Sequence, residues 1–208
     1  MSKGSRCFMM FALSVGLLSV AQASVVYQES VSGDFSGNGL APTSISVGLG
    51  SNQFFGSTGR DTNSVVDRDY LTFTVPVGAL WSGLLVLPGT TTIGNLGFIG
   101  LQAGNQVTVG TAPANAAGLL GYRHYNAADI NTDILAEIGT AGNSSTGFIP
   151  PLGAGTYSLW IQETGSGTSN YAFDIQLTAA PEPATYFTMF LALATFGFWR
   201  HKRSAAAK

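Results

Sequence analysis

Three segments of the chain alternate between apolar and polar residues with a period of two. They are 69–77, 155–162 and 171–178. Such alternation is typical of antiparallel strands that bury one face. In the first segment the apolar face comprises Leu71, Phe73, Val75 and Val77. Shorter apolar runs between glycine-rich turns predict further strands at 25–29, 44–49, 53–55, 84–87, 98–101 and 106–109. Together they predict an all-β fold, an antiparallel two-sheet sandwich of jelly-roll-like type, over residues 24–180.

One segment, 126–138, has helical spacing instead. Its apolar residues recur every one to four positions, namely Ile130, Ile134, Leu135 and Ile138. Asn126 is a suitable N-cap, and Gly139 follows the last apolar residue. We therefore predict a single short helix over 126–138 that crosses one end of the sandwich.

The N-terminal segment has the three parts of a secretory signal peptide. Its only charges are Lys3 and Arg6, and an apolar run over 8–20 follows them. As a helix this run would be roughly 20 Å long, less than the bilayer's hydrocarbon core of about 30 Å. Small residues then mark a cleavage site: Ala21, Ala23 and Ser24. We predict that 1–23 is a signal peptide cleaved after Ala23; the alternative is an uncleaved anchor.

The C-terminal segment combines three features in a fixed order. Pro181, Glu182 and Pro183 are expected to form an extended tripeptide, because proline disfavours helix at these positions. The uncharged stretch 184–199 predicts a transmembrane helix, about 24 Å long. A basic cluster ends it: Arg200, His201, Lys202 and Arg203. Basic residues mark the cytoplasmic side of a membrane, so residues 24–180 are expected outside the cytoplasm.

This C-terminal combination over 181–208 resembles the PEP-CTERM sorting signal of exported bacterial proteins. The resemblance implies that an exosortase recognises the tail and processes the chain near Pro181–Pro183. It also implies a transient anchor in the inner membrane with the domain in the periplasm, followed by release to the cell surface or the extracellular matrix. Proteins of this kind are associated with exopolysaccharide and biofilm formation. A plain C-terminal membrane anchor is the alternative.

The composition of 24–180 narrows the classes of partner. This region has three basic and ten acidic residues, a formal charge of −7, whereas the whole chain carries −2. Such a surface repels nucleic-acid phosphates, so we expect no nucleic-acid binding. Cys7, the single cysteine, lies in the predicted signal peptide, so a disulfide or a thiol nucleophile is not expected in the domain.

A second resemblance lies inside the domain. The segment 67–78, with sequence DRDYLTFTVPVG, is similar to a stretch of bacterial pre-peptidase C-terminal domains. The segment 155–160, GTYSLW, looks like a later strand of the same modules. This resemblance implies a β-sandwich accessory module on a secreted protein.

The densest group of oxygen ligands precedes one of the predicted strands: Asp61, Asn63, Asp67 and Asp69. Calcium prefers several carboxylate and carbonyl oxygens on a flexible loop, so this group is a candidate calcium site. The alternative is that these residues form turns. An EF-hand at 129–140 is excluded, because Ile134 occupies its glycine position and Thr140 its glutamate position. Calcium is thus the one cofactor for which the sequence offers candidate ligands.

Catalytic residues are not evident in the sequence. His124 has no Gly-x-Ser-x-Gly elbow near it, and we expect it to be a packed or surface residue. Glu163 beside Trp160 is the other candidate, and we expect Glu163 to be a solvated turn residue. Four aromatic residues could form a sugar-stacking surface: Trp81, Tyr122, Tyr125 and Trp160. For Trp160 we expect a core position instead.

These observations favour a non-enzymatic surface or extracellular-matrix protein that an exosortase sorts. A carbohydrate- or calcium-binding accessory module is the alternative, and a hydrolase built around His124 is a third hypothesis. An exposed aromatic platform would favour the second, and a pocket that joins His124 to a hydroxyl and a carboxylate would favour the third.

Overall fold

The computed structural model describes residues 23–94, 96–111 and 115–181. Most of the predicted signal peptide, with Ala21, lies outside this range, as do Glu182, Pro183 and the predicted helix and basic cluster that follow. Ala23, Ser24 and Pro181 lie within it and are exposed. Among the described residues, no helix has both the length and the apolarity to cross a membrane.

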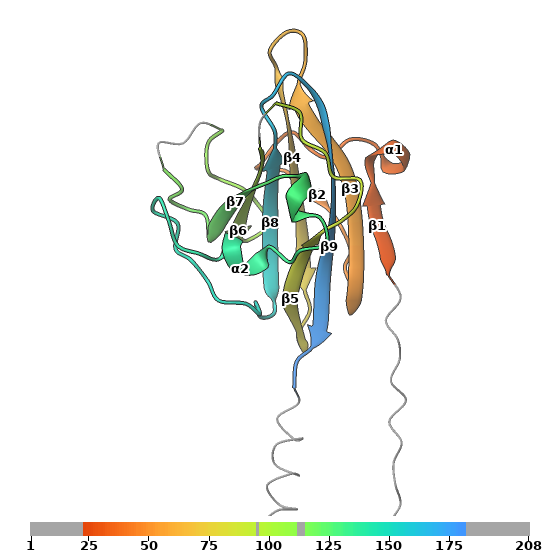
Figure 1. Ribbon diagram of the computed structural model, residues 1–208. Helices are drawn as coiled ribbons and strands as arrows, with labels where there is room; N and C mark the ends of the chain where they lie inside the picture. The colour runs from red at the N-terminus through yellow and green to blue at the C-terminus, as the bar shows by residue number, and fades with distance from the viewer. Residues whose placement is uncertain (1–22, 95, 112–114, 182–208) are drawn as a thin grey trace, which may run out of the picture.

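The described residues form nine strands in one sheet, with the order β5-β9-β3-β4-β8-β6-β7. β1 lies parallel to β3 and β2 parallel to β4, and all other pairs are antiparallel. The strands are β1 (Ser24–Gln28), β2 (Thr43–Ser44), β3 (Gly50–Arg60), β4 (Val66–Val75), β5 (Ala79–Val86), β6 (Gly97–Ala103), β7 (Gly121–Tyr125), β8 (Gly155–Gln162) and β9 (Gly167–Ala179). Short helices are α1 (Glu29–Ser32), the 3-10 turn η1 (Ala127–Asp129) and α2 (Leu135–Ile138). The expected antiparallel β-fold with minor helix is confirmed (Figure 1).

The sheet curls strongly because two of its central strands pair over only a short length. β3 and β4 pair at Gly59 with Asp67 and at Arg60 with Val66, next to the loop that joins them. Away from this loop β3 continues beside β9, and β4 beside β8. The two halves fold toward each other over a shared core, in which Phe73 of β4 meets Trp81 of β5 at a ring distance of 5.0 Å. The two expected sheets are therefore joined into one, since the β3–β4 pairing is retained.

The alternating pattern predicts a strand correctly where every residue of the segment pairs with neighbouring strands. β8 matches the predicted 155–162, and Tyr157, Leu159 and Ile161 lie in the core. β4, by contrast, ends at Val75, and Val77 is 95% exposed. The inward position expected for Val77 is wrong, because Pro76 has no N–H for a strand ladder and a turn begins at it. The expected strands at 44–49 and 106–109 are wrong: β2 overlaps the first only at Ser44, and 106–109 is irregular.

The single helix predicted over 126–138 is also wrong, although its caps are placed as expected. The Asn126 side chain caps η1 by accepting from the Ala128 N–H at 2.7 Å. Gly139 is the C-cap of α2. Between η1 and α2 the chain leaves helical geometry, and Asn131 takes a positive φ of 66°.

Pairing with an edge strand explains this break. β5 lies at one end of the strand order, so its outer edge needs hydrogen-bond partners. The Asn131 N–H donates to the Val86 carbonyl at 2.7 Å, and the Ile134 N–H donates to the Leu84 carbonyl at 2.9 Å. The Asp133 carboxylate accepts from the Leu84 N–H at 2.8 Å. The segment therefore closes the edge of the sheet instead of continuing as helix.

Candidate functional site

Three carboxylates from separate parts of the chain converge beside the end of β1. Glu29 begins α1, Asp34 lies in the loop after it, and Asp69 lies in β4. One carboxylate oxygen of each residue lies within 4.8 Å of the other two. The three differ in exposure: Asp69 is buried, Glu29 is partly buried and Asp34 is exposed. We call this group the acidic cluster.

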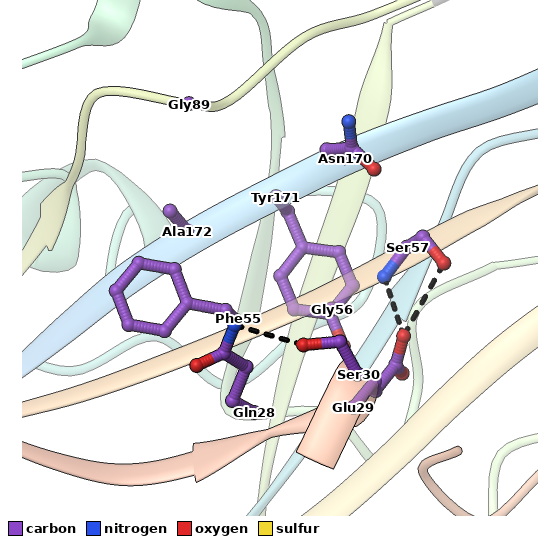
Figure 2. A pocket seen from close by; sticks show the side chains of 10 residues that line it. All are labelled: Gln28, Glu29, Ser30, Phe55, Gly56, Ser57, Gly89, Asn170, Tyr171 and Ala172. Atoms are coloured by element: carbon purple, nitrogen blue, oxygen red, sulfur yellow. Dashed lines mark hydrogen bonds between the residues drawn. The ribbon is translucent and has the colours of Figure 1, made fainter. Parts of the chain in front are cut away.

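Glu29 is held by backbone and hydroxyl donors. Its Oε2 accepts from the Ser57 N–H at 2.8 Å and from the Ser57 hydroxyl at 3.3 Å, as Figure 2 shows. Its Oε1 accepts from the Phe35 N–H at 3.4 Å. Gly56 is needed here for space, since a Cβ at this position would lie 2.2 Å from the Tyr171 hydroxyl and 2.8 Å from Glu29 Oε1. The local sequence thus brings Glu29 and Tyr171 together across β3.

Asp69 faces the interior of the curled sheet. It lies opposite Ile161 of β8 and is 0% exposed. Its Oδ2 accepts from the Tyr171 hydroxyl of β9 at 2.7 Å, so this hydrogen bond spans the two halves of the sheet. Its Oδ1 is buried and has no hydrogen-bond partner among the described residues. A buried oxygen without a partner is rare in a native protein, because it loses its hydration without compensation.

The cluster gathers acidic groups without basic partners among the described residues. Burial, followed by the charge of Glu29, raises the pKa of Asp69 to about 9. Burial also raises the pKa of Glu29, against the hydrogen bonds from Ser57. The ion pairs within the described ranges are both made by Arg123, to Asp129 at 2.7 Å and to Glu137 at 3.6 Å. In the described structure, therefore, no basic side chain forms an ion pair with the cluster.

Aromatic rings enclose the inner side of the cluster. Tyr27 and Phe35 are stacked with ring centroids 4.2 Å apart, and Phe35 lies 6.5 Å from the ring of Tyr171. The Tyr27 hydroxyl donates to the Gly33 carbonyl at 3.0 Å, which fixes the loop that carries Asp34. Glu29 and Tyr171 also border a hollow of about 280 Å³ (Figure 2). The cluster therefore adjoins a group of packed aromatic rings through Tyr171 and reaches solvent at Asp34.

The predicted calcium ligands are divided by the structure. The carboxylate of Asp61 accepts from the N–H groups of Asn63 and Val65 at 2.9 and 2.8 Å, so it shapes its own loop. Asp61 and Asp67 border a second hollow, of about 560 Å³. Asp69 faces the interior toward Tyr171 instead. Of the four residues, Asp69 alone belongs to the acidic cluster.

The catalytic candidates lie apart and differ in burial. His124 is exposed, and its ring packs on Phe98 and Tyr122 at 5.7 and 6.3 Å. Glu163 is 1% exposed and accepts from the Gly165 N–H and the Ser169 hydroxyl, each at 2.5 Å. The solvated position expected for Glu163 is wrong, because its carboxylate ties the β8–β9 turn together from inside.

Most of the aromatic candidates are buried. Trp81 and Tyr125 are in the main core, with 0% and 2% of their surface exposed. Trp160 is 2% exposed, which confirms its expected core position, although it packs with Tyr70 in a separate small cluster. Tyr122 alone of the four is partly exposed. In the described structure, therefore, the four candidates for a sugar-stacking surface form no exposed platform.

Sequence reasoning missed Glu29 and Asp34 as members of a site. Neither lies at a ligand spacing from Asp69, and each counted only as a surface acid. Their proximity results from the parallel pairing of β1 with β3 and from the β4 alternation that turns Asp69 inward. The inward parity of Asp69, shared with Leu71 and Phe73, was the one signal available in the sequence.

No protein-family model matches the chain. No curated protein matches it in sequence. Among solved structures, the crystal structure of Salmonella Typhimurium PliG, a periplasmic lysozyme inhibitor of g-type lysozyme, is similar over 65% of this chain and 98% of that one. The identity is 15% and the TM-score 0.31, which does not establish a shared fold, so neither fold nor function follows from it.

Proposed function

We propose that this chain is an exported, non-enzymatic surface or extracellular-matrix protein that an exosortase sorts through its C-terminal segment. The observation that carries the proposal is the order of three elements at one end of the chain. Pro181, Glu182 and Pro183 precede an uncharged run, and a basic cluster follows it. A signal-peptide pattern at the opposite end of the sequence gives the same orientation, with the domain outside the cytoplasm.

The position of the sheet's ends supports this proposal. β1 begins at Ser24, directly after the predicted signal cleavage, and β9 ends at Ala179, just before the Pro-Glu-Pro segment. The two ends lie at the same end of the molecule (Figure 1), since Ser24 pairs with Asn52, which in turn pairs with Ile175. Both processing events would therefore remove segments outside the strands and leave the core of the domain intact.

The geometry of the candidate residues supports a binding or structural role over hydrolysis. The described hydrogen bonds include none between the His124 ring and a hydroxyl or carboxylate, and Glu163 is occupied within a buried turn. The proposal includes a jelly-roll-like arrangement of the two halves of the sheet, as in the pre-peptidase C-terminal modules that 67–78 resembles. Exopolysaccharide is the proposed partner after release.

The substitution Glu182→Ala tests the sorting mechanism. It removes one charge beside the apolar segment and leaves that segment unchanged, so membrane insertion should be retained. In a host that carries an exosortase, we expect the variant to accumulate at full length in the membrane fraction. The wild type should appear shortened at the surface or in the medium, with an N-terminus at Ser24. Immunoblots of the fractions and N-terminal sequencing provide the measurement.

Glu137→Ala is the matched control, because it removes an exposed glutamate from the folded domain. It should be processed like the wild type. If the wild type and Glu182→Ala both remain full-length in that host, the tail is a plain anchor and the sorting proposal fails.

A further inference from the structure

The acidic cluster has the properties of a cation site. Buried charges in proteins are paired with an opposite charge or coordinate a metal ion. Here Asp69 is fully buried, its Oδ1 has no partner among the described residues, and the carboxylate of Glu29 lies beside it. The Tyr171 hydroxyl donates to the other oxygen of Asp69, Oδ2, and leaves Oδ1 unpaired. This unpaired oxygen points to a ligand independently of the proximity of the three acids.

From this arrangement we infer that Glu29, Asp34 and Asp69 bind a calcium ion. Calcium takes oxygen ligands at about 2.3–2.6 Å, so ligands on opposite sides of one ion lie up to about 4.6–5.2 Å apart. The three carboxylate oxygens lie within 4.8 Å of one another, which fits that range. Magnesium, at about 2.0–2.1 Å in octahedral geometry, would hold opposite ligands within about 4.2 Å, so the titration with magnesium below separates the two ions.

One side of the site is open to solvent, so an ion can enter and water molecules can complete its coordination. Asp34 is exposed and Glu29 only partly buried, so the outer side of the ion faces solvent. On the inner side Asp69 is buried and accepts from the Tyr171 hydroxyl, and the ring of Tyr171 lies 6.5 Å from that of Phe35. Three carboxylates supply the charge that a hard divalent cation needs, and no ion pair in the described chain competes for them.

An ion at this position would join three parts of the fold. Glu29 follows β1, Asp34 belongs to the next loop, and Asp69 lies on β4 in the other half of the sheet. Calcium would therefore fix the edge formed by β1 and α1 to the centre of the curled sheet. This inference does not depend on the sorting proposal, because it concerns the folded domain alone.

Two measurements on the full-length chain test the inference. The first is the melting temperature with a chelator and with about 10 mM calcium; a site with a dissociation constant of about 0.1–1 mM should raise it by about 3–10 °C. The second is terbium luminescence. Terbium replaces calcium in oxygen sites, and Tyr171, which donates to Asp69, should sensitise its emission. Added calcium should reduce this emission, and magnesium should have a much smaller effect.

Matched substitutions locate the ion. Asp34→Asn and Asp61→Asn each neutralise one exposed aspartate, the first in the acidic cluster and the second in the loop that the sequence favoured. We expect Asp34→Asn to lose most of the calcium-dependent rise and Asp61→Asn to keep it. Asp69→Asn preserves an acceptor for Tyr171, so it should melt at or above the wild-type temperature in chelator and gain nothing from calcium.

Three results would overturn the inference. Loss of the calcium effect in Asp61→Asn, with retention in Asp34→Asn, would assign the ion to the 61–69 loop. Retention in all three variants would place it elsewhere. A wild type that responds to neither calcium nor chelator and does not sensitise terbium would show that Asp69 is instead held as a neutral carboxylic acid beside Tyr171.

Discussion

Replacing Glu163 with alanine is expected to destabilise the domain, because this glutamate organises a turn from the inside. Its Oε1 accepts from the Gly165 N–H and its Oε2 from the Ser169 hydroxyl, and the side chain is 1% exposed. The Ser169 oxygen in turn accepts from the Ile93 N–H at 2.9 Å. The substitution therefore removes the acceptor for two donors and disturbs a third hydrogen bond.

The expected loss of unfolding free energy follows from the two hydrogen bonds and from the burial of the charged carboxylate. A hydrogen bond to a charged group contributes about 1.5–3 kcal/mol, so two give an upper value of about 6 kcal/mol. Relief of the carboxylate's desolvation offsets part of this, and we expect a net loss of about 3 kcal/mol. For a domain of this size the melting temperature should fall by about 6–12 °C.

Urea denaturation followed by tryptophan fluorescence measures this loss, since Trp81 and Trp160 are both buried. Glu163→Gln is the informative comparison, because its amide oxygen still accepts from Gly165 and its nitrogen faces a hydroxyl that can accept. We expect it to lose only about 1 kcal/mol. Glu137→Ala, at an exposed glutamate, should change stability by less than about 0.5 kcal/mol. If Glu163→Ala also stays within that limit, the internal role of Glu163 is refuted.

Two further pairs of substitutions test features that the sequence pattern misassigned. Val75→Ala should lower the free energy of unfolding by about 2 kcal/mol because Val75 is 1% exposed, whereas Val77→Ala, at a 95% exposed position, should change it by less than about 0.5 kcal/mol. If urea denaturation shows equal losses of unfolding free energy for the two variants, Val77 is buried after all. Asp133→Ala should cost about 1–2 kcal/mol because it removes the acceptor for Leu84 at the edge of β5, and Asp133→Asn, which keeps an acceptor, should cost about half as much. A loss of helical circular dichroism without a loss of stability would contradict this account.

Features that depend on local pattern could be predicted from the sequence. Alternation located β8 at 155–162 and the inward residues Tyr157, Leu159 and Ile161, because a strand that faces a core requires apolar side chains at every second position. The burial of its opposite face, at Ser158 and Trp160, depends on tertiary contacts. Asn126 and Gly139 were identified as caps, because capping depends on a residue and its immediate neighbours. The burial of Trp160 was also expected, but it depended on whether the second face of its strand is covered.

Other features were decided by contacts between residues distant in the sequence. The helical pattern of 126–138 is interrupted because the open edge of β5 takes its hydrogen bonds from that segment, and the periodicity of a segment carries no information about a neighbouring edge. The two expected sheets stay joined because β3 and β4 pair beside their connecting loop. The same contacts place Asp69 with Glu29 and Asp34 and not with Asp61. The residues of the 61–69 loop form one candidate set of ligands in the sequence because they are close along the chain. The alternation of β4 instead turns Asp69 inward, and the pairing of β1 with β3 places Glu29 beside it.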